Sequence, residues 1–128
     1  APRLRHALEL RDLTLSTPEL PALLRARNIA LVFAGSDEHP SFADITADFT
    51  YARLMQSRAG LEQGYTDAEL DAWARRARTW ADGGDPDDLP HLAAPQPAGA
   101  PRDAFVFFIA SAKERNPAAA KALIGRLG

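Results

Sequence analysis

The residues best suited to chemistry lie at the ends of four apolar runs, at 4–10, 29–34, 49–54 and 104–110. Each run predicts a strand. In a parallel sheet the carboxyl ends of the strands meet at one edge, and ligands bind there. The candidates at this edge are Glu9 as the catalytic group and Arg53, Lys113, Arg11 and Ser36 as substrate-binding groups.

Two arrangements use these side chains. In the first, Arg53 and Lys113 hold an anionic group, and Glu9 acts as an acid, a base or an orienting group. In the second, Glu9 and Arg53 form an ion pair that fills the end of the sheet, while Lys113 is solvated. Arg53 lies within an apolar strand and must have a partner, because an unpaired buried charge is very costly. The sequence leaves both arrangements open.

The sequence predicts neither a metal site nor a cofactor site. Asp37, Glu38 and His39 have suitable ligand atoms, but they are adjacent and no further ligand follows at a metal-binding spacing. His6 opens a predicted strand and His91 lies in a proline-rich stretch. The chain has no cysteine, and it contains none of the phosphate-loop, dinucleotide, nucleophile-elbow or zinc-protease motifs.

The strands alternate with helices, which we predict at 18–27, 66–82 and 117–127. The middle helix has the clearest start, because Thr66 and Glu69 form a capping box. Thr17 before Pro18 predicts a second cap. Alternating strands and helices indicate an α/β fold with a parallel sheet and right-handed crossovers.

The stretch 83–103 separates the last two predicted strands and contains five prolines. A loop of this length without helix or strand is uncommon within a compact domain. We interpret it as a loop insertion, because too little chain follows it to form a second domain. Residues 1–128 are therefore predicted to be a single domain.

Composition narrows the class of partner. The chain is 46% hydrophobic and 25% charged, with a formal net charge of −2, so it lacks the basic excess of a nucleic-acid-binding protein. Its longest apolar run is too short to cross a bilayer, and no apolar signal-peptide region is visible at the N-terminus. We therefore expect no nucleic-acid partner, no membrane association and a cytoplasmic location.

Several ordered stretches give the chain a family resemblance: HALELR (6–11), IALVFAGSDEHP (29–40), DITADFTYARL (44–54), GYTDAELDAWARRARTWADGG (64–84) and PRDAFVFFIASAKERNPAAAKAL (101–123). Through them the chain resembles the C-terminal half of the YecE-like family, the domain of unknown function 72. The resemblance implies a TIM (β/α)8 barrel about twice as long and names no activity. Glu9 and Arg53 match polar positions of the family motifs. Gly35, Met55-Gln56 and 109–111 depart from the polar residues common there.

From this resemblance and the strand order we predict the C-terminal half of a TIM barrel. One functional hypothesis is an enzyme acting on a small anionic or phosphorylated substrate. The alternative is a non-catalytic half-barrel fragment or interaction module that a second chain completes. With four strands, the inner faces of Leu31, Phe33, and Phe105 or its neighbour Phe107 would lack half of their expected partners. We therefore expect that closure needs an N-terminal half-barrel or a homo-oligomer, and that the chain alone is weakly stable.

Overall fold

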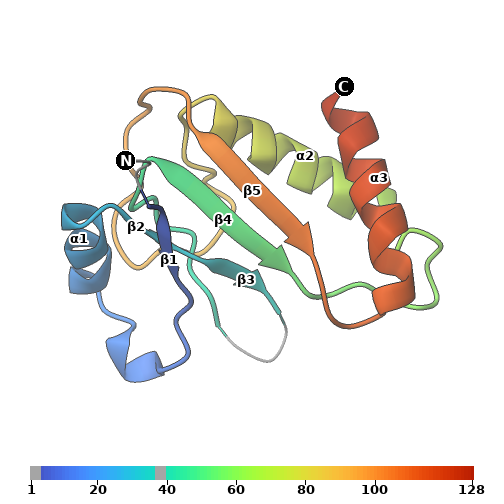
Figure 1. Ribbon diagram of the computed structural model, residues 1–128, viewed down its shortest axis with the longest axis horizontal. Coiled ribbons are helices and arrows are strands. Elements are labelled where there is room, and N and C mark those ends of the chain that lie inside the picture. Colours follow the sequence, from blue (N-terminus) through green and yellow to red (C-terminus); the bar gives the residue numbers. More distant parts are fainter. Residues whose placement is uncertain (1–3, 37–39) are drawn as a thin grey trace.

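A computed structural model describes residues 4–36 and 40–128 of the chain. Helices separate its first and last strands from the others, and in the described residues three strands follow one another between the first two α-helices (Figure 1). Within these residues no helix is both long and apolar enough to cross a membrane. The elements are β1 (His6–Leu8), η1 (Leu13–Leu15), α1 (Glu19–Ala26), β2 (Ile29–Leu31), β3 (Phe33–Gly35), β4 (Phe49–Leu54), α2 (Asp67–Ala81), β5 (Asp103–Phe108), η2 (Lys113–Arg115) and α3 (Asn116–Leu127).

The strand pairs in the described ranges are all parallel, which confirms the predicted α/β class. β1 pairs with β2, and β4 lies between β3 and β5. The predicted strand at 29–34 is divided into β2 and β3 at Val32. The N–H of Val32 donates to the carbonyl oxygen of Leu8 at 2.8 Å, so the chain leaves the β1 pairing here before it pairs with β4.

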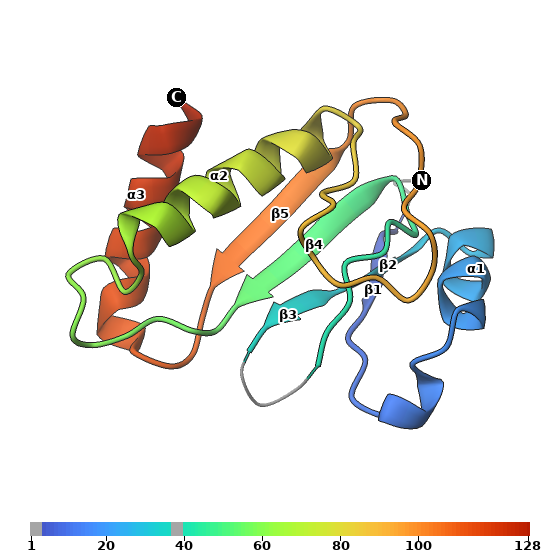
Figure 2. The ribbon, with the colours of Figure 1, turned by 180° about the vertical axis from the view of Figure 1, so that it is seen from behind.

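The core lies between one face of the β3–β4–β5 sheet and the two C-terminal helices. In Figure 2, α2 runs along this face, and α3 lies at its far end beside β5. Ala52 and Leu54 of β4 are fully buried beneath Leu70, Trp73 and Trp80 of α2. These side chains follow the three- and four-residue spacing of an amphipathic helix, so burial of one stripe fixes α2 on the sheet.

The opposite face of β4 and β5 carries exposed aromatic side chains. The Tyr51 ring lies 6.5 Å from Phe105 and 5.1 Å from Phe107, measured between ring centroids. Phe105 is 37% exposed and Phe107 is 43% exposed. Because side chains alternate between the two faces of a strand, this face also carries Arg53.

The expectation that Leu31 and Phe33 would also lie on an open face is wrong. Both are buried. Phe33 is in register with Ala52, which faces the helices, and its ring contacts Trp73 of α2 at 5.7 Å between centroids. Only Phe105 and Phe107 of the predicted set remain uncovered in this structure.

The predicted capping box of α2 is confirmed. The Thr66 hydroxyl accepts from the Glu69 N–H at 3.1 Å, and the Glu69 carboxylate accepts from the Thr66 N–H at 2.8 Å. The cap predicted at Thr17 does not form, since the N-cap position of α1 is Pro18 and no side chain bonds there. The last helix, α3, begins at Asn116 and has a proline in its first turn.

The stretch between α2 and β5 contains no helix or strand, as predicted, but it is firmly anchored. The Arg102 guanidinium donates to the carbonyl oxygens of Trp80, Gly83 and Gly84 at 2.9, 2.9 and 2.6 Å. These carbonyls lie at the C-terminal end of α2, where a cation is favoured by the helix dipole. Gly83 has a φ of 95°, which glycine adopts without steric cost.

Removing the capping hydroxyl of α2 should destabilise the fold. We expect Thr66→Ala to lower the free energy of unfolding by about 1 kcal/mol, because it leaves a helix N–H unpaired. Thr17→Ala is the matched control, since its hydroxyl caps no helix. Urea unfolding followed by circular dichroism measures both variants. Equal effects of the two substitutions would contradict the assignment.

Candidate functional site

The charged cluster at the carboxyl end of the sheet consists of Glu9, Arg11 and Arg53. Arg53 Nη1 donates to Glu9 Oε1, and Arg11 Nη2 forms an ion pair with Glu9 Oε2. The Glu9 side chain is 17% exposed, that of Arg53 is 31% and that of Arg11 is 59%. One carboxylate therefore faces two guanidinium groups, and the cluster carries one net positive charge.

The sheet brings these residues together over long sequence distances. Glu9 and Arg11 follow β1, which pairs with β2 at one side of the molecule. Arg53 lies on β4, in register with Ala34 of β3 and Phe107 of β5. The structure contains the ion pair between Glu9 and Arg53, which is one of the two arrangements that the sequence left open. Arg11 is an additional partner of Glu9.

A cleft of about 490 Å³ opens beyond the same strand ends. The loops after β3, β4 and β5 form most of its wall, and the first turn of α2 closes one side. Met55 is only two residues beyond Arg53, which places the cleft about 7 Å along β4 from the charged cluster. Its lining residues are Ser36, Met55, Gln56, Ser57, Arg58, Glu69, Ala110 and Ser111.

The two charged residues of this cleft neutralise each other. Arg58 Nη2 donates to Glu69 Oε1. Burial opposes ionisation of Glu69, but hydrogen bonds from Thr66 and the nearby Arg58 outweigh it and lower the pKa of Glu69. The carboxylate is therefore ionised near neutral pH, and Arg58 contributes little uncompensated charge. The net charge near the cleft comes from the cluster around Arg53.

Hydrogen bonds hold the loops after β4 and β5 together. The Ser111 hydroxyl donates to the Ser57 carbonyl oxygen at 2.7 Å, and the Ser57 hydroxyl donates to the Ala112 carbonyl oxygen at 3.2 Å. Asn116 Nδ2 donates to the Ala110 carbonyl oxygen at 3.1 Å. Ala110 and Ser111 have φ of 57° and 53°, a conformation that costs free energy in residues other than glycine.

The structure thus divides the five predicted site residues among three places. Glu9, Arg11 and Arg53 form the charged cluster, and Ser36 lines the adjacent cleft. Lys113 is exposed at the start of η2. Within the described residues no hydrogen bond or ion pair joins the side chain of Lys113 to the charged cluster.

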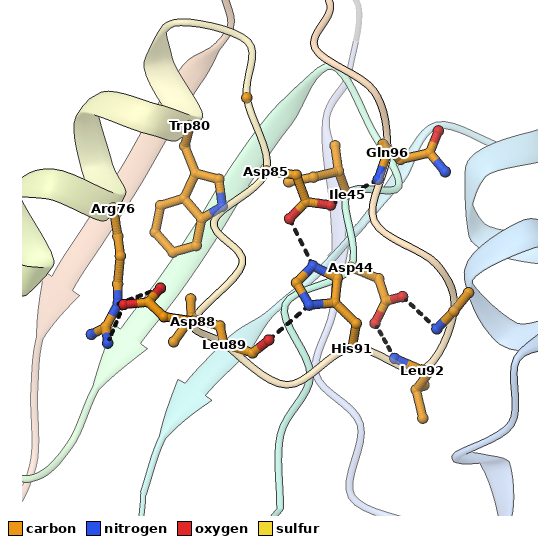
Figure 3. Close-up of polar contacts among 12 residues, drawn as sticks. Asp44, Ile45, Arg76, Trp80, Asp85, Asp88, Leu89, His91, Leu92 and Gln96 are labelled. Carbon is orange, nitrogen blue, oxygen red and sulfur yellow. Dashed lines mark hydrogen bonds and ion pairs between the residues drawn. The ribbon is translucent and has the colours of Figure 1, made fainter.

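A second polar cluster was not predicted. His91, which we regarded as a weak signal, lies between Asp85 and Asp44 beneath the stretch that precedes β5 (Figure 3). Its members come from two loops 41 to 47 residues apart in the sequence, and neither loop has a periodic pattern. No sequence pattern indicates that these residues interact, because the two loops come into contact only in the folded chain.

The metal prediction concerned Asp37, Glu38 and His39, which lie outside the described residues. Elsewhere, within residues 4–36 and 40–128, the structure contains no group of three or more acidic or histidine side chains arranged to hold a metal ion.

Comparisons with known proteins identify a family. A family model described as "Protein of unknown function DUF72" matches residues 1–128. Neither a curated protein nor a solved structure matches the chain.

A double-mutant cycle between Glu9 and Arg53 should reveal their coupling. We expect Glu9→Gln and Arg53→Gln to show a coupling free energy of about 1 kcal/mol in urea unfolding, the upper range for partly exposed pairs. The Arg5–Asp103 pair, whose side chains are 45% and 63% exposed, is the matched control and should couple more weakly. A coupling free energy no larger than that of the control pair would show that the Glu9–Arg53 pair stabilises the fold no more than an exposed ion pair does.

Proposed function

The chain belongs to the DUF72 family, and from that premise we propose that it forms half of a (β/α)8 barrel that binds a small anionic molecule at its strand ends. The observation that carries the proposal is the Glu9 carboxylate between Arg11 and Arg53. Two guanidinium groups on one carboxylate leave a positive charge. In this architecture, ligands bind at the carboxyl ends of the strands.

The half-barrel part of the proposal rests on the sheet. The strands are parallel, their order follows the chain, and α2 and α3 cover one face. A barrel interior is filled by side chains from all its strands. The exposed rings of Phe105 and Phe107 suit such an interior when further strands complete it. We propose that residues 1–128 form one unit of that barrel, with 83–103 as an insertion.

Arg53 and Arg11 are the proposed anion-binding groups. Arg53 is held on the sheet, whereas Arg11 is more exposed and projects from the loop after β1. Glu9 fixes the Arg53 guanidinium through one carboxylate oxygen, so its proposed role is to orient the arginines. For Glu9 to act as an acid or a base, a ligand would have to displace an arginine from it.

The neighbouring cleft is suited to hydrogen bonding with the rest of the ligand. The carbonyl oxygens of Ser57, Ala110 and Ala112 accept from side chains of the surrounding loops. The nearby Lys113, which is exposed, and the position of the cleft after the last strands favour a phosphorylated ligand.

A second candidate function is an interaction module without catalysis. The observation that favours it is the exposed aromatic face, because adjacent apolar side chains of this size usually contact another surface. The covering surface would be an N-terminal half-barrel or a second copy of the chain. This candidate and the anion site are compatible, since the charged cluster lies at the end of the same face.

Titration with inorganic phosphate tests the anion site. We expect amide chemical shifts near Arg53 and in 109–113 to change, and Arg53→Gln to weaken binding at least about tenfold, the typical loss for one charge-assisted contact. Glu9→Gln should retain or strengthen binding, because the glutamine oxygen can still accept from Arg53 and orient it, while the competing negative charge is removed. Arg75→Gln, on the exposed face of α2, is the control. Unchanged affinity in Arg53→Gln would refute the site.

Sedimentation velocity tests the open face. We expect the isolated chain to self-associate with increasing concentration, and Phe107→Lys to suppress this association because the charge disfavours burial of the face. Ile124→Lys on α3, where the side chain is 66% exposed, is the matched control. A compact monomer at all concentrations with a stable, cooperative melt would show that the half-barrel proposal is wrong.

A further inference from the structure

The stretch 85–96 lies on the helix side of the sheet, against the loop that leads into β4 (Figure 2). The Ala43 N–H donates to the Pro90 carbonyl oxygen at 2.7 Å. The Asp44 carboxylate accepts from the N–H groups of Leu92 and Ala93 at 2.8 and 3.0 Å. These bonds join two irregular segments, and Asp44 itself is buried. We call 85–96 the covering segment.

His91 is the centre of this junction (Figure 3). Its Nε2 atom lies 2.7 Å from Asp85 Oδ1, and its Nδ1 atom lies 2.8 Å from the Leu89 carbonyl oxygen. Carboxylate and carbonyl oxygens only accept, so each ring nitrogen must donate for both bonds to form. A neutral imidazole has one N–H, whereas the imidazolium ion has two. Both bonds therefore form when the ring is protonated.

Other charged groups around His91 agree with a positive ring. Asp85 also accepts from the Gln96 N–H at 3.0 Å, and the Asp44 carboxylate acts on His91 through its charge. Arg102 lies near enough to interact with Asp85. Further along, Asp88 is paired with Arg76 of α2. The ring thus lies among carboxylates, and the nearest cations are already bonded to other acceptors.

We propose that the His91 imidazolium is a pH-sensitive lock that holds the covering segment on the loop at 43–46. When the ring loses its proton, one of its two hydrogen bonds is lost. The buried Asp85 and Asp44 carboxylates then lose the positive charge of the ring, which is unfavourable away from water. The covering segment consequently detaches more readily at alkaline pH, while the rest of the fold persists.

The direction of the pH dependence follows from the burial and charges around the ring. Burial opposes protonation of His91, but the Asp85 hydrogen bond, the Leu89 hydrogen bond and the charges of Asp85 and Asp44 outweigh it and raise the pKa of His91. A histidine in an unfolded chain has a pKa of about 6.5. The stabilisation by His91 is therefore fully present below about pH 6.5 and is lost as pH rises through the raised value.

The lock bears on the candidate site because the covering segment forms walls next to it. Pro90 lines a cleft of about 310 Å³ together with Ser36 and Gln56. Leu89 lines another cleft with Gln56 and Glu69. Ser36, Gln56 and Glu69 also line the cleft of the proposed ligand. Detachment of the covering segment would therefore remove the support behind residues of that cleft. This last step alone rests on the proposed function.

Nitrogen NMR of the histidine side chains tests the lock directly on the unaltered chain. We expect the raised pKa of His91 to place its titration above that of a histidine in an unfolded chain, which the urea-unfolded protein measures. At the pH where the unfolded-chain histidines are half neutral, both ring nitrogens of His91 should still carry protons. A His91 ring that titrates at or below the unfolded-chain value would overturn the proposal.

Amide exchange tests the movement of the covering segment. After correction for intrinsic rates, we expect exchange in 85–96 to rise at least about tenfold between about pH 6 and about pH 9, the factor for loss of one charge-assisted hydrogen bond. His91→Gln should remove this rise, whereas His6→Gln should keep it. If His91→Gln retained the pH dependence, the lock would be wrong. Phosphate binding is measured in a separate titration. A negative result for the His91 lock would therefore not refute the anion site, and a negative phosphate titration would not refute the lock.

Discussion

Parallel strands are apolar on both faces, so a sheet made of them must be covered on both sides. β3, β4 and β5 meet this constraint on the side of α2 and α3, where Leu54, Leu70 and Trp80 are buried. On the other side Phe105 and Phe107 remain exposed. The uncovered face explains the proposed half-barrel. Because Arg53 lies on this uncovered face, its side chain can reach Glu9, which follows β1 at the edge of the face.

On the side of the sheet covered by α2 and α3, part of the cover is irregular backbone rather than helix. No helix lies between β3 and β4 in the described residues, and the stretch before β5 covers this part of the sheet instead. Irregular backbone at a core boundary has polar groups that need partners. Asp44, Asp85, His91 and Arg102 supply them. The charged side chains beneath this stretch replace the internal hydrogen bonds that a helix would provide, and this replacement makes the cover sensitive to pH.

The sequence predicted the elements that depend on local patterns. Apolar runs located the strands, and the Thr66–Glu69 pair located the start of α2 because both partners lie within one turn. The cap at Thr17 failed, because Pro18 rather than Thr17 occupies the N-cap position. The His91 cluster was missed because its partners lie in distant loops without periodicity. Lys113 was assigned to the site by its place after a strand, although an exposed side chain on η2 is not fixed by the strand.

Arg11 distinguishes the two arrangements that the sequence left open, an anion-binding site and a purely structural ion pair of Glu9 with Arg53. A purely structural role explains the pair itself, because Arg53 lies on a strand and is only partly exposed. It does not explain Arg11, which is largely exposed and has little need of a partner. With both arginines present, the Glu9 carboxylate has more positive charge around it than it can neutralise. In the proposed function, an anion that enters at the strand ends would contact Arg11 and Arg53 while Glu9 keeps the Arg53 guanidinium in place, so one cluster would serve both the stability of the sheet and the binding.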